Sequence, residues 1–384
     1  MKAKTYRYLA AAALTAAFVF LPAVSMVRSR LLPATDFACF YANAVVWRQG
    51  GNPYDLSQQW KAQSKIGLPD FRVNVYPPFQ VVVLAPFARL SFAHAFLAWS
   101  FLNLALLILY LWILWNCKLA DEPLHLTLVA LFFPMWIAMY LGQFSFWLLD
   151  AFALAYLLLR QRRDGAAGFA LGIGLIKFPS LLPFALIFAL RRRWKFIGGL
   201  LFAGVILLLI SVAAMGAARM ASYIRLSLAA FGGRTPAYSG FQHVSVLGAF
   251  GPKYAMLLAG LGLAAFVAFQ WKQNDDDPPM YAAAIVASLI AAPYMWPHDL
   301  TPFAFAATLI ASKTGCKLRV RADAVLFAAL IYVYAAPLFL TLLDDRSTLS
   351  ALAPGLVAIV LALVITPMRA KEKTNAKLLQ EEKI

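Results

Sequence analysis

Charged side chains are scarce in this sequence. Asp, Glu, Lys and Arg make up 13% of the 384 residues, and 62% are hydrophobic, whereas ordinary soluble domains contain about 25% charged residues. This shortage of charge excludes a water-soluble globular protein. Apolar runs of about 15 to 25 residues recur along the chain, and a helix of that length crosses the hydrocarbon core of a bilayer. The composition therefore predicts an all-α polytopic membrane protein.

Cysteines and acidic residues are also few. The three cysteines, at positions 39, 117 and 316, lack metal-ligand spacing, and the topology below places Cys39 on the opposite side from the other two. We interpret them as small apolar fillers. The 17 acidic residues are outnumbered by 34 Lys and Arg residues, giving a formal net charge of +17. Because the basic residues lie in short clusters between apolar stretches, we interpret them as orienting the spans and expect no nucleic-acid partner.

These basic clusters predict the topology, because Lys and Arg are retained on the cytoplasmic side of short loops. We expect a multi-pass protein of the bacterial inner (plasma) membrane with both termini in the cytoplasm. The first apolar run follows basic residues like a signal peptide, but its length favours an uncleaved span. The clusters lie at 160–163, 191–195, 313–321 and 369–383. The predicted spans, about twelve, lie at 8–27, 93–116, 124–141, 144–160, 165–177, 178–190, 196–216, 252–271, 279–292, 299–312, 323–342 and 351–367.

Two external loops are long enough to carry function, and they cover 28–92 and 217–251. The stretch 77–91 contains three prolines and is too short to cross comfortably, so we place it in the outer interface. Residues 1–367 are interpreted as a single integral membrane domain, and 368–384 as a polar cytoplasmic tail.

The predicted pair 165–177 and 178–190 is unusually short. Basic clusters flank both outer ends, and Lys177, Phe178 and Pro179 lie at the bend between the two helices. Both ends are therefore expected on the cytoplasmic side. A helix of about 12 residues rises only about 18 Å, so the bend is expected in the outer part of the bilayer, with Lys177 inside a protein cavity or reaching for the outer surface.

Few charged residues lie near membrane depth, where each costs about 2.5 to 3.5 kcal/mol on insertion scales. Asp36 is one of them, and it begins a predicted helix at 36–48 that Gly50 and Gly51 end. Thr35 or Asp36 is expected to cap this helix, and capping is the structural alternative to a general-base role for Asp36. The others are Asp150, Lys177, His298 and Asp299.

Several short motifs occur in an order that resembles glycosyltransferase family 87. They are DFACFYANA (36–44), GGNPYD (50–55), YPPF (76–79), GQFSFWLL (142–149), AGFALGIGLIKFPSLLPFALIFALRRRW (167–194) and APYMWPHD (292–299). This resemblance implies a C-type glycosyltransferase fold with about twelve membrane helices. It also implies an inverting transfer of a hexose, with mannose best represented, from a polyprenyl-phosphate sugar to a glycolipid or glycan acceptor.

The resemblance also implies roles for two residues. Asp36 matches the acidic residue of the family's first loop, the general base. His298 matches a histidine that acts at the donor phosphate or in acceptor alignment. Many relatives read W-x-H-Y there, whereas this chain has Trp296, Pro297, His298 and Asp299.

The chemistry of this transfer needs a base for the acceptor hydroxyl and a cation for the departing phosphate. Lys177 is the first candidate for the cation, with snorkelling to the surface as its structural alternative. Arg225 and Arg234 are further candidates, although a surface-charge role is the favoured interpretation of both. Gln143 is interpreted as a sugar ligand or a helix cap. Tyr41, Tyr54, Tyr76 and His243 are interpreted as lining a carbohydrate site or as interface anchors.

Asp150 has two interpretations: a structural ion pair with Lys177, or a protonated carboxyl group among helices. No metal site is predicted, because Asp36 is followed by Phe37 and Ala38 and so forms no DxD pair. We expect no cofactor and metal-independent turnover.

Two other classes fit the composition. A secondary transporter or lipid flippase would share the span count, but the long first loop with its acidic residue and the absence of matching halves argue against it. A non-catalytic subunit of a membrane assembly stays open. The partners we expect are the lipid-linked donor, the acceptor and membrane lipids.

Overall fold

The fold is helical throughout the part of the chain that is described. The structure is a computed structural model, and it describes residues 2–28, 32–68, 71–119, 126, 129–231, 253–271, 277–292, 296–314, 331–333 and 359. No strand occurs among these residues, so the all-α prediction is confirmed for them. Cys316, the predicted tail at 368–384 and nearly all of the last two predicted spans lie outside the described residues.

Within the described part of the chain, four helical segments are long and apolar enough to cross a membrane. They are Leu9–Val27 in α1 (Lys2–Arg28), α5 (Phe92–Asn116), Asp164–Leu190, and Trp194–Ala230 in α11 (Trp194–Phe231). Large apolar side chains on α11, including Phe202 and Leu209, are about 60% exposed. Exposed apolar side chains on such helices suit contact with lipid tails. The predicted membrane-helix character is therefore confirmed.

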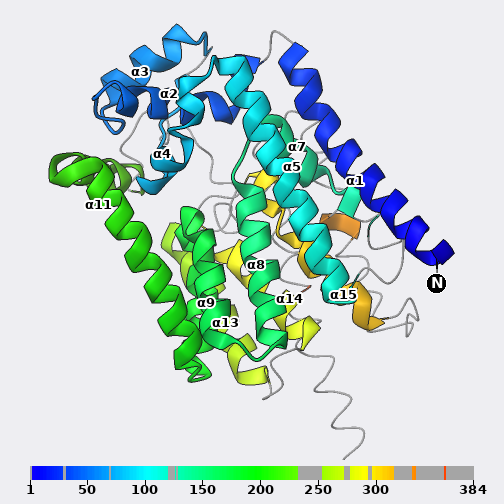
Figure 1. Cartoon of the computed structure of the whole chain (residues 1–384). Coiled ribbons are helices and arrows are strands. Elements are labelled where there is room, and N and C mark those ends of the chain that lie inside the picture. The colour runs from blue at the N-terminus through cyan, green and yellow to red at the C-terminus, as the bar shows by residue number, and fades with distance from the viewer. Residues whose placement is uncertain are drawn as a thin grey trace, which may run out of the picture.

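Shorter helices complete the bundle (Figure 1). α7 (Phe133–Leu141) and α8 (Ser145–Arg160) follow α5 in the chain. α13 (Lys253–Gln270), α14 (Pro278–Ala291) and α15 (Phe303–Thr314) come later. α14 packs against both α13 and α15, and every side chain from Met280 to Ala291 is buried, which makes it a central helix of the bundle.

Residues 164–190 enter the bundle and return to the same end. They form α9 (Asp164–Leu171), η3 (Gly172–Leu181) and α10 (Leu182–Leu190), and the backbone leaves helical geometry at Lys177 (φ −122°, ψ 57°). Arg193 donates two hydrogen bonds of 2.6 and 2.8 Å to Asp164. The two ends of the segment are therefore adjacent, which confirms the predicted bend at Lys177. The segment is long enough to span, but it does not run straight through.

The described residues between 32 and 91 form a helical unit at one end of the bundle, which we call the first-loop unit. It contains η1 (Leu32–Ala34), α2 (Asp36–Arg48), α3 (Leu56–Lys65), α4 (Phe79–Leu84) and η2 (Phe87–Arg89). The predicted helix at 36–48 is confirmed, and Gly50 follows its end with φ +80°. α4 and η2 are far too short to cross a bilayer, in agreement with the interpretation of 77–91.

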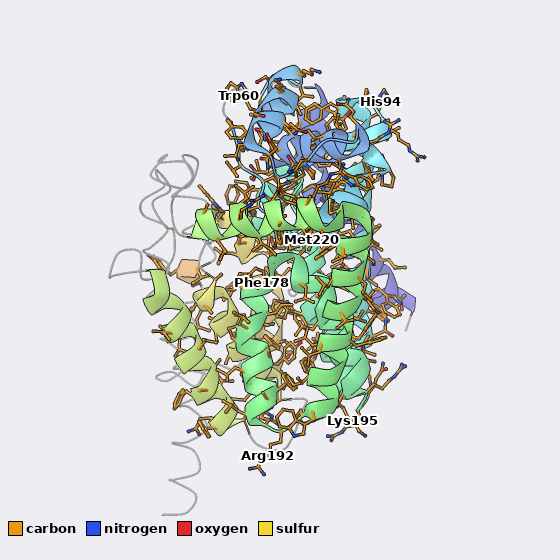
Figure 2. The ribbon with its side chains drawn as sticks, turned by 90° about the vertical axis from the view of Figure 1, so that its left-hand side faces the viewer. Trp60, His94, Phe178, Arg192, Lys195 and Met220 are labelled. Carbon is orange, nitrogen blue, oxygen red and sulfur yellow. The ribbon has the colours of Figure 1, made fainter. Side chains whose placement is uncertain are left out.

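The second part of α11 fixes this unit on the bundle. The helix kinks at Gly216 (φ +69°, ψ 169°), and the residues after it lie beneath the first-loop unit, where Figure 2 labels Met220. Arg219 donates to the Gly50 carbonyl (2.6 Å), and the Tyr54 and Tyr223 ring centroids are 5.1 Å apart. The kink lies at the predicted end of the span at 196–216, and the residues after it pack against the first-loop unit.

The molecule thus has two chemically different ends. Figure 2 shows Trp60 and His94 at the end that bears the first-loop unit, and Arg192 and Lys195 at the opposite end. Arg160, at the basic end, donates to the backbone carbonyl of Cys117. Cys39 lies in the first-loop unit, so the predicted separation of these two buried, free cysteines is confirmed.

Candidate active site

Asp36 occupies the first position of α2, and three side chains form a network around it. Arg72 makes an ion pair with Asp36 Oδ1, and Gln143 Nε2 donates to Asp36 Oδ2. The Tyr76 hydroxyl donates to Gln143 Oε1 (3.3 Å). The interpretation of Asp36 as the cap of its helix is wrong, because Thr35 is the N-cap residue and no side chain caps this end. The Asp36 carboxylate faces other segments of the chain.

A glycine turn between α7 and α8 brings Gln143 to Asp36. Gly142 ends α7 with φ +68°, in the left-handed region that favours glycine. A Cβ atom there would lie 2.7 Å from the Cβ of Phe37, the neighbour of Asp36 in α2. Trp99 Nε1 of α5 donates to the Gly142 carbonyl (2.8 Å) and holds the turn from the other side. The close approach of α2 to this turn therefore depends on the missing side chain.

We expect Gly142→Ala to lower stability by about 1 to 3 kcal/mol, since it adds left-handed strain to a clash with Phe37. The displaced turn would also separate Gln143 from Asp36 and reduce activity. Thermal unfolding of the purified protein measures the first effect. Gly198→Ala is the matched control, because a Cβ at Gly198 meets no atom within 4 Å. Equal unfolding temperatures for the two variants would contradict this account of the turn.

Lys177, at the bend of the segment 164–190, belongs to a second polar group. Its Nζ makes an ion pair with Asp299 Oδ1 and donates to Ser145 Oγ (3.4 Å). The Lys177 side chain is only 12% exposed. Lys177 therefore points into protein, and its snorkelling interpretation is wrong.

The short helix η4 (Pro297–Leu300) holds Asp299 and His298. Asp299 Oδ2 accepts from the backbone N–H of Trp296 (2.8 Å), and His298 Nε2 lies 3.5 Å from Asp299 Oδ1. The Lys177 ammonium beside it favours the charged form of the Asp299 carboxyl group. Asp299 is therefore a carboxylate that orients both its neighbours.

His298 lies within electrostatic reach of both polar groups. Burial lowers the pKa of its imidazole below the ordinary value, Asp299 and Asp36 oppose this shift, and Lys177 adds to it. Burial is the largest of these effects, so the imidazole is neutral at pH 7. A neutral imidazole can donate at one nitrogen and accept at the other.

The two groups form one site. Gln143 contacts Asp36, and Ser145, two residues later, contacts Lys177. Two residues of chain span at most about 7 Å. A carboxylate and an ammonium group therefore lie on either side of a single turn, at the end of the bundle that bears the first-loop unit.

Of the other residues singled out from the sequence, only Tyr76 contacts the site within the described part of the chain. Tyr76 belongs to the site through Gln143, whereas the Tyr41 hydroxyl donates to the Leu90 carbonyl (2.8 Å) and takes no part in the Asp36 network. Tyr54 donates to the Tyr76 carbonyl (3.1 Å). Arg225 is exposed on the second part of α11. Arg234 and His243 lie outside the described residues.

The predicted ion pair between Asp150 and Lys177 is wrong, because Lys177 pairs with Asp299. Asp150 is 4% exposed in α8, and within the described part of the chain neither of its carboxyl oxygens has a hydrogen-bond partner. The second interpretation, a protonated carboxyl group among helices, stays a prediction. Helix spacing explains why Lys177 and Asp150 do not pair. Lys177 reaches Ser145 in the first turn of α8, whereas Asp150 lies more than one turn further along that helix.

Among the described residues, no group of three or more His, Cys, Asp or Glu side chains could hold a metal ion. What the site offers instead is two carboxylates, two cations, one imidazole and the amide of Gln143. Such a set can accept a proton from a hydroxyl group and can stabilise negative charge that develops on a phosphate.

The sequence model of Glycosyltransferase family 87 matches residues 74–297, more than half of the chain. The chain belongs to glycosyltransferase family 87. This membership confirms the resemblance and shows that the protein is a membrane glycosyltransferase with a sugar donor and an acceptor as its substrates. The matched range includes Gln143 and Lys177, ends one residue before His298 and begins after Asp36 and Arg72. No curated protein and no solved structure matches the chain.

The sequence patterns did not identify Arg72 as a residue of this family 87 site. They also did not indicate a positioning role for Asp299. Arg72 lies in a polar stretch of the first loop among several other charged residues, and no spacing distinguishes it. Asp299 offered a signal, since it is an acidic residue at a span end beside His298. Its pairing with Lys177, 122 positions earlier in the chain, requires the fold.

Proposed function

We propose that this family 87 glycosyltransferase transfers a hexose, mannose being the first choice, from a polyprenyl-phosphate sugar to a glycolipid or glycan acceptor. Asp36 is the general base, and the anomeric configuration inverts. The supporting observation is the juxtaposition of Asp36 and Lys177 across the turn at 143–145. The proposal includes a C-type fold of about twelve spans in the bacterial inner membrane, with the site on the extracytoplasmic side.

Asp36 takes the proton of the acceptor hydroxyl as its oxygen forms a bond to the anomeric carbon of the donor sugar. The bond between that carbon and the phosphate oxygen breaks, and its electron pair stays on the phosphate. The phosphodiester thereby becomes a phosphate monoester with one more negative charge, which Lys177 stabilises. No second acid is needed, because phosphate is a good leaving group. His298, within reach of Asp36 and Lys177, aligns the acceptor or the donor phosphate.

Transfer from a defined donor tests this function. The purified protein in proteoliposomes is incubated with radiolabelled polyprenyl-phosphate mannose and membrane lipid extract, and the labelled products are separated by chromatography. We expect a labelled glycolipid or glycan that appears only with active protein, and an α- or β-linkage opposite to that of the donor. Transfer from a sugar nucleotide without any lipid-linked donor would contradict the proposal.

Metal removal gives a second test of the mechanism. The cations Lys177 and Arg72 supply the positive charge that a divalent metal supplies in other glycosyltransferases, so we expect full turnover in EDTA. The measurement compares initial rates before and after chelation, with Mg²⁺ and Mn²⁺ added back. Loss of activity in EDTA and its recovery with either metal would show that the charge at the phosphate comes from an ion.

A further inference from the structure

The backbone of Arg72 is clamped in place by α3. Gln63, which is 1% exposed, accepts from the Arg72 backbone N–H (2.9 Å) and donates to the Arg72 carbonyl (2.7 Å). Gln59, one turn earlier and fully buried, makes the same two contacts with Asn74 (3.1 and 3.3 Å). Two side-chain amides thus replace the strand that would pair with this extended segment. They fix the position from which the Arg72 side chain extends.

The Arg72 guanidinium is only partly used. Within the described part of the chain its one ion pair is with Asp36, through Nη1, although a guanidinium carries five N–H donors in a planar fork that matches phosphate oxygens. The Arg72 side chain is 34% exposed and that of Asp36 is 22% exposed. The remaining donors are therefore accessible to an anion that approaches Asp36.

The same ion pair opposes the role of Asp36. A carboxylate that accepts a proton from a hydroxyl group must have an oxygen that the hydroxyl can reach. In this structure Arg72 holds one Asp36 oxygen and Gln143 holds the other. Both oxygens of the proposed base are therefore engaged by protein side chains.

We propose that Arg72 is a phosphate-binding residue. It pairs with Asp36 and exchanges this ion pair for one with the phosphodiester of the lipid-linked donor when the donor arrives. The inference rests on the proposed function, because it takes Asp36 as the base and a lipid phosphodiester as the donor headgroup. Arrival of the donor uncovers Asp36 Oδ1 for the acceptor hydroxyl. Donor binding then precedes productive acceptor binding, and Arg72 joins Lys177 in stabilising the charge that appears on the phosphate.

Binding of the lipid product tests the first half of this proposal without turnover. Undecaprenyl phosphate, undecaprenol and inorganic phosphate are titrated separately into the purified protein in nanodiscs. We expect Arg72→Gln to weaken binding of undecaprenyl phosphate about tenfold or more, the size of a lost charge-assisted hydrogen bond, and Arg72→Lys to weaken it less. Binding of undecaprenol stays unchanged. Lys61→Gln, which removes an exposed cation of α3, is the matched control and binds like wild type.

Two results would overturn the proposal that Arg72 binds the phosphate of the lipid. Equal affinity of wild type and Arg72→Gln for undecaprenyl phosphate would leave Arg72 as a counterion of Asp36 only. Inorganic phosphate that binds as tightly as undecaprenyl phosphate would assign the site to free phosphate.

The second half of the proposal is the exchange of partners by Arg72, and it predicts a variant with a higher affinity for undecaprenyl phosphate. If Asp36 competes with the phosphate for Arg72, Asp36→Asn binds undecaprenyl phosphate several-fold more tightly than wild type. A misfolded protein cannot produce such a gain. In an Arg72→Gln background the gain disappears, since no shared cation remains. A gain of equal size in that background would show general repulsion between Asp36 and the phosphate and would overturn the exchange.

The same preparations separate failure of this inference from failure of the proposed function. Arg72-dependent binding in a protein that transfers no mannose from the lipid donor would reject the proposed function and keep the phosphate site. Transfer by wild type, together with an unchanged donor KM in Arg72→Gln, would keep the function and reject the role of Arg72.

Discussion

Asp36→Asn is expected to abolish glycosyl transfer almost completely, with a loss of about 10² to 10⁴ in kcat, the usual contribution of a general base. The amide keeps the shape of the side chain and its contact with Gln143, but it cannot take the acceptor proton. Asp36→Glu keeps the base and displaces it by one methylene, so we expect partial activity. Initial rates of mannosyl transfer under saturating donor measure both effects.

Asp55→Asn is the matched control for this prediction. Asp55 is an acidic residue of the same first-loop unit, and its carboxylate caps α3 by accepting from the backbone N–H groups of Ser57 and Gln58. Asn is an equally good N-cap residue, so this variant should fold and turn over like wild type. Asp36→Asn that transfers at the wild-type rate would remove Asp36 from the mechanism. Gel filtration and thermal unfolding of each variant distinguish loss of chemistry from loss of fold.

The helices of this protein were predictable from sequence where one signal dominated. The apolar runs predicted the positions of α5, α8, α13 and α14 to within one or two residues, because a long continuous apolar run indicates a buried or membrane helix without knowledge of its partners. The bend at Lys177 was predictable for a related reason. Basic clusters flank both outer ends of a segment that Pro179 interrupts, so the chain had to return.

The contacts inside the site were less predictable, because they join segments that lie far apart in sequence. Asp36 and Lys177 stood out as rare charges near membrane depth, but the sequence offered Asp150 as the partner of Lys177. That choice failed because a residue's depth along a helix does not define the direction of its side chain. Asp299 reaches Lys177 since Trp296 fixes its other oxygen. Arg72 had no distinguishing pattern in the sequence, and its proposed role follows from its ion pair with Asp36 and from the Gln63 clamp.

Lys177→Gln is expected to lower kcat/KM for the lipid-linked donor by about 100-fold, the cost of removing one group that stabilises a developing oxyanion. Lys177→Arg keeps the charge and the ability to pair with both Asp299 and a phosphate, so we expect it to retain more activity than the Gln variant. Steady-state kinetics at varied donor concentration measure the difference. Equal activity of the two variants would mean that charge at position 177 is not used by the donor.

Folding must be controlled in this experiment, because Lys177→Gln leaves Asp299 as a poorly exposed carboxylate without its cation. Breaking a buried ion pair by removing one partner costs about 3 to 5 kcal/mol, whereas removing both charges is often nearly neutral. We therefore expect the double variant Lys177→Gln with Asp299→Asn to unfold at a higher temperature than Lys177→Gln alone. Its donor kcat/KM should stay low. Recovery of activity together with stability would show that Lys177 only neutralises Asp299, whereas stability without activity would assign its charge to the donor phosphate.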